Sequence, residues 1–454
     1  MKRKSRRQFL KESVTAGAAA GSTLLARENL MASAAPAPGK SLGANDRIHV
    51  GLIGCGGMGR GDLRDFLQVK NVECAALCDV DDQQSAMASK VLFEDQGLQK
   101  PALVTRDFRR VLDQRDIDAV IVGTPDHWHA LPTIMACQAG KDVYVEKPLA
   151  LTIAEGRAMV GVARKYNRVV QMGTQQRSAP HYTEAVEYVK SGQLGKIRLV
   201  RAWAYLDWKG ELPPVPDSDP PPTVDYEMWL GPAPKRPYNK NRFHFTFRWF
   251  WDYSGGLMTD WGAHMIDIAN WAMGVKAPSS AVSVGGKYGY PNDAMETPDT
   301  QQVIWAFPEF TMIWEHMLGA GRGPEAREHG VLFHANNGVL VVDRGGWEVY
   351  PETDRIDKPR QYKAAGVPRR TAVTQTYHLT HVQNFVDCMR SRKRPNSDVE
   401  IGHNSMIACH LGNIAQRLGR QIKWDVENEK IIGDPEAQKF VSKEYRAPWK
   451  LTTT

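Results

Sequence analysis

Six consecutive residues, Gly54-Cys55-Gly56-Gly57-Met58-Gly59, constrain the fold of this chain more than any other feature. They form a G-x-G-x-x-G pattern directly after the apolar run 48–53 and before a helix-like segment at 59–69. In such a strand–turn–helix unit the first glycine allows the turn, the second admits a pyrophosphate, and the third lets helix and strand pack closely. The helix N-terminus then faces the phosphates. The pattern predicts a dinucleotide site formed by Gly54, Gly56, Gly57, Met58 and Gly59.

An acidic residue after the second apolar run supports this interpretation. Asp79 follows the run Val72–Cys78 and lies 20 residues beyond Gly59. A carboxylate at that position binds the ribose 2′-hydroxyl, and it repels the 2′-phosphate of NADP. The sequence therefore predicts NAD as the cofactor and disfavours NADP.

Apolar runs alternate with helix-like segments up to residue 172. The apolar runs are 48–53, 72–78, 119–122, 143–145 and 169–172, and the helix-like segments are 59–69, 82–97, 130–139 and 153–166. This rhythm predicts a parallel sheet covered by helices on both faces. Functional side chains are then expected at the carboxyl ends of the strands. We assign residues 47–171 to a Rossmann domain.

The remainder, residues 172–454, has a different character and is predicted to be an α+β domain. A long strand is expected at 197–205, and nine prolines exclude regular structure from 211–237. Antiparallel strands are predicted at 279–288, 301–307, 310–318 and 329–343, and helices near 255–273, 379–391 and 401–418.

The first 46 residues read as an export signal and a linker. Ser5-Arg6-Arg7-Gln8-Phe9-Leu10-Lys11 resembles a twin-arginine motif, a mild apolar stretch follows, and Ala32-Ser33-Ala34 offers a cleavage site. We predict a twin-arginine signal peptide at 1–34, a linker at 35–46, the twin-arginine translocase as a partner, and a periplasmic location. Residues 1–34 carry a net charge of +5 out of +7 for the chain, which argues against nucleic acid as a partner.

The six cysteines show no C-x-x-C pair, and most lie within apolar patterns. We expect free, buried thiols rather than disulfides or a zinc site. The chain also has no apolar run of about 18 residues, as an ordinary membrane span requires.

Two further clusters follow predicted strands. Thr124-Pro125-Asp126-His127-Trp128-His129 comes after the run 119–122, and Glu146-Lys147-Pro148 comes after 143–145. Both should border the dinucleotide crevice, where the Lys147 amine can polarise a hydroxyl or carbonyl oxygen. His127 and His129 could bind a metal, but no carboxylate or cysteine nearby completes a site, so we predict no metal and a loop over the nicotinamide. The predicted cofactor contacts here are Thr124, Pro125, His127, Glu146 and Lys147.

A third cluster lies at Asp260, His264 and Asp267. On a continuous helix these residues share one face. A carboxylate beside an imidazole raises its basicity, and a histidine tuned near neutrality suits removal of a hydroxyl proton.

Together the three clusters resemble the Gfo/Idh/MocA oxidoreductase family (glucose–fructose oxidoreductase, inositol dehydrogenase and rhizopine catabolism protein) from about residue 47 to 425. The resemblance implies a Rossmann domain followed by an open, mainly antiparallel sheet that forms a homo-oligomer interface. It implies NAD or NADP chemistry on a hydroxyl of a sugar, sugar derivative or cyclitol. Lys147 would assist, His264 would be the acid/base, and Asp260 would orient the substrate or His264. Gln175 and Arg177 would contact the substrate.

The resemblance leaves two kinds of enzyme open. Exported members often retain their nucleotide through the catalytic cycle, which implies a tightly bound cofactor. A second branch hydrolyses glycosides by transient oxidation with bound NAD, but it does not keep Glu-Lys-Pro in this form, so we place a hydrolase or lyase second. A non-catalytic binding protein on the same scaffold is a third alternative.

Overall fold

The computed structural model describes residues 46–354, 362–373 and 377–452. The predicted signal peptide, its cleavage site and the linker up to residue 45 lie outside the described residues. Within the described chain, no helix has the length and apolar character that crossing a membrane requires.

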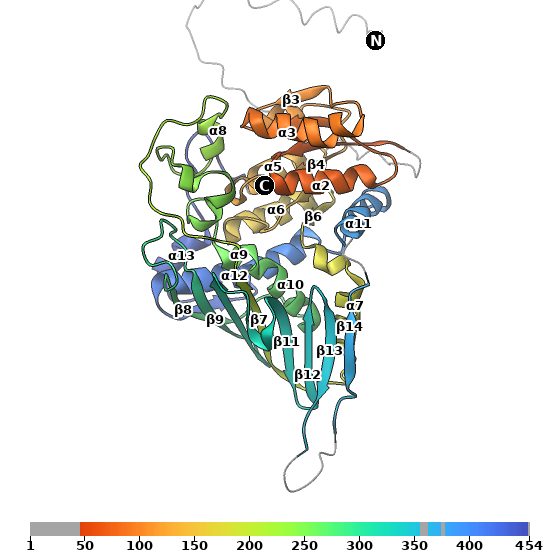
Figure 1. Ribbon diagram of the computed structural model, residues 1–454, viewed down its shortest axis with the longest axis vertical. Helices are drawn as coiled ribbons and strands as arrows, with labels where there is room; N and C mark the ends of the chain where they lie inside the picture. Colours follow the sequence, from red (N-terminus) through yellow and green to blue (C-terminus); the bar gives the residue numbers. More distant parts are fainter. Residues whose placement is uncertain (1–45, 355–361, 374–376, 453–454) are drawn as a thin grey trace, which may run out of the picture. The chain divides into compact units, whose positions relative to one another are not determined.

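The first sheet is the predicted parallel sheet, which lies in the part of Figure 1 that holds β3, β4 and β6. It has six strands in the order β3-β2-β1-β4-β5-β6. Its strands are β1 Ile48–Ile53, β2 Val72–Cys78, β3 Leu103–Thr105, β4 Ala119–Val122, β5 Asp142–Val145 and β6 Val170–Met172. All neighbouring strands pair in parallel. This is the doubly wound order, and the crevice at its switch point lies between the ends of β1 and β4.

Helices cover both faces of this sheet. The helices that follow its strands are α2 Gly57–Gln68, α3 Asp82–Leu92, α4 Phe108–Leu112, α5 Ala130–Gln138 and α6 Ile153–Lys165. On the face of α2 and α3, a third helix arrives from late in the chain: α11, Tyr377–Ser391. Its Phe385 packs edge-on against Phe66 of α2, with ring centroids 5.8 Å apart. The Rossmann domain is therefore completed by residues well beyond 171.

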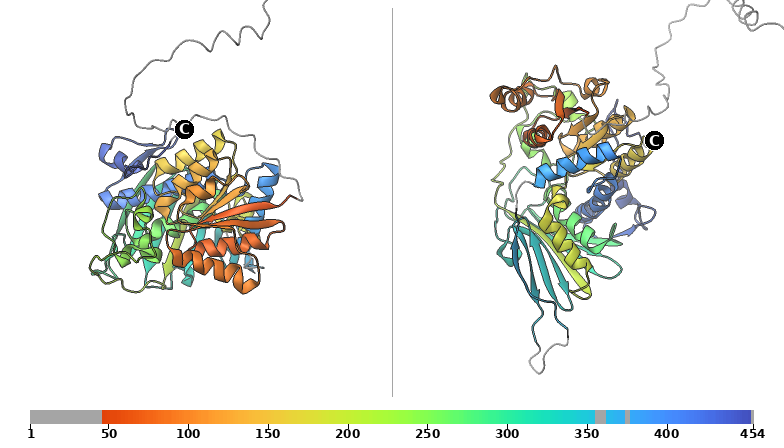
Figure 2. Two further views of the ribbon diagram at one scale, coloured as in Figure 1. Left: turned by 90° about the horizontal axis from the view of Figure 1, so that it is seen from above. Right: turned by 90° about the vertical axis from the view of Figure 1, so that its right-hand side faces the viewer.

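The second sheet has ten strands in the order β14-β13-β12-β11-β7-β10-β9-β8-β15-β16. The strands are β7 Ile197–Leu206, β8 Ser280–Gly286, β9 Thr300–Ala306, β10 Thr311–Leu318, β11 His329–Ala335, β12 Gly338–Asp343, β13 Gly346–Pro351, β14 Val367–Thr371, β15 Ile422–Asp425 and β16 Lys430–Ile431. Only β7 and β10 pair in parallel, so the sheet is mainly antiparallel, as expected. Helices α7 Pro180–Lys190, α10 Gly262–Met273 and α12 Val399–Leu418 pack on one side of it (Figure 2).

Three details differ from the sequence prediction. The proline-rich stretch 211–237 contains a short helix, α8 Tyr226–Leu230, because Asp225 caps it by accepting a hydrogen bond from the Met228 amide at 3.0 Å. The helix expected at 255–273 is interrupted at Trp261, between α9 Leu257–Asp260 and α10. The run 329–343 turns after Ala335 and forms two strands. The expectation of free cysteines is confirmed, and five of the six are buried.

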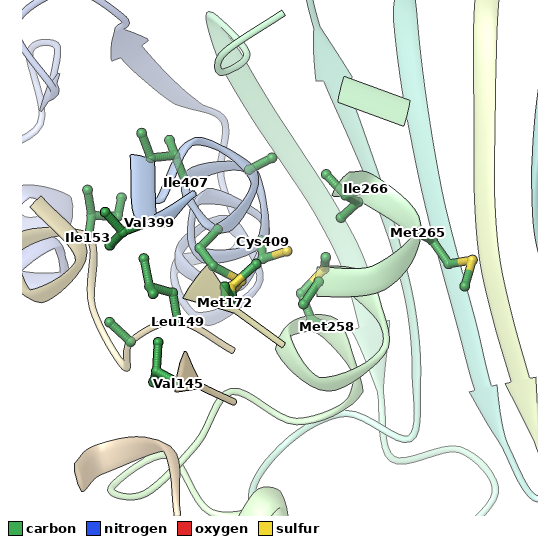
Figure 3. Packing of buried hydrophobic residues seen from close by; sticks show 14 of the residues in the cluster. Val145, Leu149, Ile153, Met172, Met258, Met265, Ile266, Val399, Ile407 and Cys409 are labelled. Carbon is green, nitrogen blue, oxygen red and sulfur yellow. The ribbon is translucent and has the colours of Figure 1, made fainter. Parts of the chain in front are cut away.

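One hydrophobic core joins the two sheets and fixes the ends of the elements that carry the candidate site (Figure 3). Val145 at the end of β5 and Met172 at the end of β6 pack in the same core as Met258 of α9 and Cys409 of α12. Glu146 and Lys147 directly follow Val145, and Asp260 lies two residues after Met258. Close packing resists small shifts of such elements, so the core fixes the relative position of these polar side chains.

Candidate active site

The glycine turn has the backbone geometry that the motif predicts. Gly54 has a φ of +93°, and a Cβ there would lie 2.6 Å from the Gly123 backbone. A Cβ on Gly59 would overlap the carbonyl oxygen of Gly54, so this third glycine serves helix–strand packing. Gly56 and Gly57 instead face open space, with nothing within 4 Å of an added Cβ. Backbone amides at the start of α2, where no side chain caps the helix, are therefore open to a phosphate group.

A cavity of about 640 Å³ opens at this turn and runs along the carboxyl ends of β1, β2, β4 and β5. Of the predicted cofactor contacts, those lining it are Gly54, Gly56, Gly57, Met58, Asp79, Thr124, Pro125, Glu146 and Lys147. Further lining residues that the sequence analysis did not select are Arg60, Gln84, Arg106, Asp126, Trp128, Met228, Trp229, His244, Phe245, Phe247 and Arg248. Asp126 could have been found from the sequence, because it follows β4 in the same cluster as Thr124.

Asp79 is fixed at the end of β2 by the glycine turn itself. Its carboxylate accepts a hydrogen bond from the Cys55 amide at 2.6 Å and one from the Asp81 amide at 2.9 Å. Burial raises the pKa of Asp79 to about 6, and these two amides oppose that increase. The residues therefore fit a dinucleotide: open amides for the pyrophosphate, Asp79 for a ribose hydroxyl, and a buried Thr124 hydroxyl without a partner among the described residues.

Lys147, which lines the cavity, forms an ion pair with Asp260. The two residues are far apart in sequence, yet the Lys147 ammonium contacts Asp260 directly, with side chains 16% and 10% exposed. Arg248 lies 3.6 Å from the other Asp260 oxygen. Burial opposes ionisation of Asp260, but the positive charges of Lys147 and Arg248 hold its pKa below the usual value. Asp260 thus orients the Lys147 ammonium.

Two further buried carboxyls line the same cavity. Asp126 accepts a hydrogen bond from the Ser254 hydroxyl, and burial raises its pKa to about 7. Burial also raises the pKa of Glu146 to about 7, with the neighbouring Lys147 opposing the shift. Glu146 accepts a hydrogen bond from the Lys147 amide at 3.2 Å. Both carboxyls can therefore exchange protons near neutral pH.

His264 lies on α10, is buried, and does not pair with Asp260. Its Nδ1 atom has no hydrogen-bond partner in the part of the chain that the structure describes. Burial, and after it the charges of Arg344 and Lys147, holds the pKa of His264 well below its usual value. The expected increase in basicity from Asp260 is therefore wrong, because the helix break at Trp261 leaves Asp260 bonded to Lys147 instead.

A long loop covers the cavity from the side of the second sheet. In this cover segment, residues 207–250, the Asp225 amide donates to Val80 at 2.8 Å and Thr223 accepts from the Asp82 amide at 3.1 Å. His244 Nε2 contacts the Asp81 carboxylate at 2.9 Å. Met228, Trp229, His244, Phe245, Phe247 and Arg248 of this segment line the cavity. Residues 80–82, which follow β2, are thus hydrogen-bonded to the cover segment, which lies outside the Rossmann domain in sequence.

His127 anchors the cover segment and does not line the cavity. Its Nε2 donates to the Trp229 carbonyl at 2.9 Å, and the Trp128 indole donates to the same oxygen. His129 contacts the carbonyl oxygens of Pro148 and Thr124. Within the described residues, no group of three or more His, Cys, Asp or Glu is arranged to hold a metal ion.

The two predicted substrate contacts after β6 have partners of their own. Arg177 donates to both carboxylate oxygens of Asp267, at 2.6 and 2.9 Å, and the Ser405 hydroxyl also bonds this carboxylate. The Gln175 amide nitrogen lies 2.9 Å from His378 Nε2. Arg177 is therefore committed to a buried ion pair with Asp267, whereas Gln175 joins a group of histidines near His264.

Comparison with protein families gives two matches. A model described as "Oxidoreductase family, NAD-binding Rossmann fold" (GFO_IDH_MocA) matches residues 48–174, and one described as "Oxidoreductase family, C-terminal alpha/beta domain" (GFO_IDH_MocA_C2) matches residues 189–303 and 365–451. Together they cover most of the chain.

Curated relatives match a smaller part. A glycosyl hydrolase family 109 protein of Shewanella pealeana is 33% identical over 206 residues, which is 42% of this chain and 44% of the relative. A family 109 protein of Shewanella sp. (strain ANA-3) is 35% identical over 176 residues, or 37% of this chain and 38% of the relative. The chain thus spans less than half the length of these relatives.

Solved structures share the fold. Levoglucosan dehydrogenase in complex with NADH and levoglucosan is 19% identical with a TM-score of 0.61, and the match covers 83% of this chain and 99% of that one. An aldose–aldose oxidoreductase from Caulobacter crescentus is 20% identical with a TM-score of 0.62 over the same shares.

Proposed function

Because the chain belongs to the Gfo/Idh/MocA oxidoreductase family, we propose that it is an NAD-dependent oxidoreductase acting on a secondary hydroxyl of a sugar, sugar derivative or cyclitol. The observation that carries the proposal is the Lys147–Asp260 ion pair, which borders the same cavity as the open amides of Gly56 and Gly57. That arrangement places a fixed cation beside a dinucleotide cradle. The levoglucosan dehydrogenase complex, which holds NADH and a sugar, supports the choice of cofactor and substrate class.

The proposal gives one task each to Lys147, His264 and Asp260. NAD, when bound, accepts the hydride from the substrate C–H bond. Lys147 donates a hydrogen bond to the substrate oxygen and stabilises its negative charge as the O–H proton leaves. His264, held neutral by burial, takes that proton, and Asp260 orients Lys147. The alcohol thereby becomes a carbonyl, and its hydride and proton are both accounted for.

The cover segment supports a tightly bound cofactor. The cover segment bonds to Val80 and Asp82 through its backbone and to Asp81 through His244. These contacts lie next to Asp79, on the route by which a bound nucleotide would leave the cavity. Release would then require these contacts to open, which slows exchange.

Glycoside hydrolysis or lyase chemistry by transient oxidation is the second candidate. The names of the curated family 109 relatives favour it, over the parts of the chain that they match. The same Lys147, His264 and Asp260 would serve it, but no net redox change would result.

The test begins with protein purified without added nucleotide. Denaturation and mass spectrometry should release NAD(H) at close to one molecule per chain. Sugars and cyclitols are then tested in donor–acceptor pairs, and aryl glycosides are tested without an acceptor. Cleavage of a glycoside without net reduction would favour the second candidate. Release of NADP(H) would contradict the role of Asp79, and a protein that binds neither nucleotide would exclude both candidates.

We also propose export through the twin-arginine translocase to the periplasm, on the strength of Arg6 and Arg7 in the N-terminal sequence. Residues 1–34 fused to a reporter should direct it to the periplasm, and the Arg6→Lys, Arg7→Lys double variant should leave it in the cytoplasm.

A homo-oligomer is proposed as well. Val282, Val284 and Ile304 are 37%, 70% and 45% exposed on β8 and β9, whereas their neighbours Ala281 and Val303 are buried. An apolar strip of this kind is typical of an interface. Light scattering in solution should give a mass above that of one chain.

A further inference from the structure

Beside His264, four other residues from separate elements form a group that the proposed chemistry does not use. Trp261 lies between α9 and α10, His329 starts β11, Arg344 lies in the turn between β12 and β13, and His378 lies on α11. We call these four residues together with His264 the Arg344 cluster. The Arg344 guanidinium carbon lies 4.4 Å from the Trp261 ring centroid, and the His329 ring centroid lies 4.9 Å from that of Trp261.

Arg344 has no carboxylate partner among the described residues. Its neighbour in sequence, Asp343, is used by two other arginines: Arg327 at 3.1 Å and Arg369 at 2.7 Å. The Nε atom of Arg344 is buried and donates no hydrogen bond within the described chain. A guanidinium that is partly withdrawn from water without a counter-charge is costly, and an anionic ligand would remove that cost.

The histidines around Arg344 also have free hydrogen-bonding capacity. Neither ring nitrogen of His329, and not the Nδ1 atom of His264, has a partner in the described parts of the chain. The Gln175 amide nitrogen donates to His378 Nε2, which must therefore be unprotonated. Burial, followed by the charge of Arg344, lowers the pKa of His329 and of His378 to about 4. The cluster thus offers one permanent cation surrounded by neutral imidazoles.

This charge lies within electrostatic reach of the proposed reacting groups. Arg344 contributes to the lowered pKa of both His264 and Asp260, as Lys147 does. One substrate molecule could therefore place an anionic group on Arg344 and its reacting hydroxyl beside His264 and Lys147. It would also offset the charge that makes His264 a weak base.

From these contacts we infer that the substrate is a sugar acid, whose carboxylate binds Arg344 and the unpartnered nitrogens of His329. The inference rests on the proposed function and specifies its substrate class. The planar guanidinium matches a carboxylate in a two-hydrogen-bond arrangement. A carboxylate is favoured over a phosphate because the cluster supplies one unpaired cation: Lys147 and Arg248, the other cations near His264, both lie against Asp260.

The test compares binding of matched ligands by calorimetry with the full-length mature protein. The panel consists of glucuronate, galacturonate and gluconate, the neutral amides of these acids, the parent sugars, and glucose 6-phosphate. The wild-type protein should bind at least one acid roughly 10- to 100-fold more tightly than its amide, as loss of a charged hydrogen bond predicts. Arg344→Gln should abolish that difference and leave the amide affinity unchanged.

Arg370→Gln is the matched control, because Arg370 also stacks on a tryptophan, Trp347, at 5.0 Å but lies outside the cluster. It should keep the preference for the acid, and melting temperatures will show whether each variant folds. The inference is overturned if no acid binds more tightly than its amide, or if Arg344→Gln keeps the preference. It is also overturned if glucose 6-phosphate is the ligand that depends most on Arg344.

Nucleotide content and turnover are measured on the same preparations, so the two proposals can fail separately. Bound NAD with oxidation of neutral sugars, unaffected by Arg344→Gln, would leave the proposed function intact and refute the sugar-acid inference. An Arg344-dependent preference for the acid in a protein without nucleotide or turnover would refute the proposed function alone.

Discussion

At the scale of single residues, the pairing of Lys147 with Asp260 determines which groups can act on a substrate. Asp260 is held ionised by Lys147 and Arg248, so it orients a cation and does not itself accept a proton near neutral pH. We assign proton transfer to His264, which burial, and after it the charges of Arg344 and Lys147, keeps neutral by lowering its pKa.

We predict that Lys147→Met lowers kcat/KM on the order of 10³-fold, since a positioned cation stabilises charge that develops in the transition state. Nucleotide content should stay near that of the wild type, because the pyrophosphate and ribose contacts lie elsewhere in the cavity. Lys165→Met, which alters an exposed lysine on α6, serves as the control. Full activity in Lys147→Met would exclude this role.

The glycine turn offers a second prediction, which separates folding from binding. Gly57→Ala adds a methyl group to open space at the cavity, so the melting temperature should hold while nucleotide affinity falls. Gly59→Ala drives a methyl group into the Gly54 carbonyl and should cost about 1–3 kcal/mol of stability, as overpacking does. Thermal melts and equilibrium dialysis of both variants test this, and equal melting temperatures would contradict it.

The sequence identified Lys147, Asp260 and His264 singly but not their partners. An i, i+4 spacing suggested that Asp260 faces His264, whereas the break at Trp261 and the approach of β5 placed it on Lys147. Arg344 gave no signal in sequence, because its proposed role depends on its surroundings in space, where the described residues supply no carboxylate partner. Local sequence patterns show which side chains follow a strand. They do not show which charged residue, far away in sequence, forms an ion pair with them.

At the scale of elements, the cover segment connects the cofactor cavity to the second sheet. Its main-chain bonds to Val80 and Asp82 attach it to the chain just after β2, and Trp229 is held by His127 and Trp128. The nine prolines predicted a stretch without regular structure at 211–237, and α8 contradicts that prediction. Its position over the cavity depends on long-range contacts that composition does not encode.

We expect His244→Ala to speed nucleotide exchange roughly 10-fold, because it removes a hydrogen bond to the Asp81 carboxylate that closes the cover segment. His334→Ala on β11 is the control. Exchange is measured by adding isotope-labelled NAD to the purified protein and following the released cofactor. Identical rates in the wild type and His244→Ala would show that the contact does not limit release.

Strands that are marked by a run of apolar residues could be predicted from the sequence. Strands that form only by pairing with a neighbouring strand could not. Five of the six Rossmann strands were assigned, because buried parallel strands are continuous apolar runs. The missed strand, β3, has three residues of which only Thr105 is buried. Four of the five residues of β14 are exposed and two are arginines, so no apolar pattern marks this strand.

At the scale of the whole molecule, the interior is unusually rich in neutral histidine. Burial lowers the pKa of twelve histidines, in His127 to about 3 and in His129, His316, His329, His378, His381 and His410 to about 4. Burial raises the pKa of six carboxyls, in Asp79 to about 6 and in Asp126 and Glu146 to about 7.

These shifts predict that the protein loses stability as the pH falls from 7 to 5. An unfolded histidine has a pKa of about 6.5, so the unfolded state binds more protons in this range and each such histidine destabilises the fold on acidification. The six carboxyls act in the opposite direction, because burial favours their protonated form in the folded state, but they are fewer than the twelve histidines. Melting temperatures at pH 5, 6 and 7 test the sign, and a maximum at pH 5 would contradict it.

The late return of the chain to the Rossmann sheet has a consequence for biosynthesis. Helix α11 covers the face shared by α2, and Arg164 of α6 pairs with Asp398 just before α12, so two of the last helices to be made complete the first domain. A nascent chain that has emerged only as far as β12 lacks this support. We therefore expect the chain to capture a dinucleotide only after α11 has been made, well after the Rossmann strands have left the ribosome.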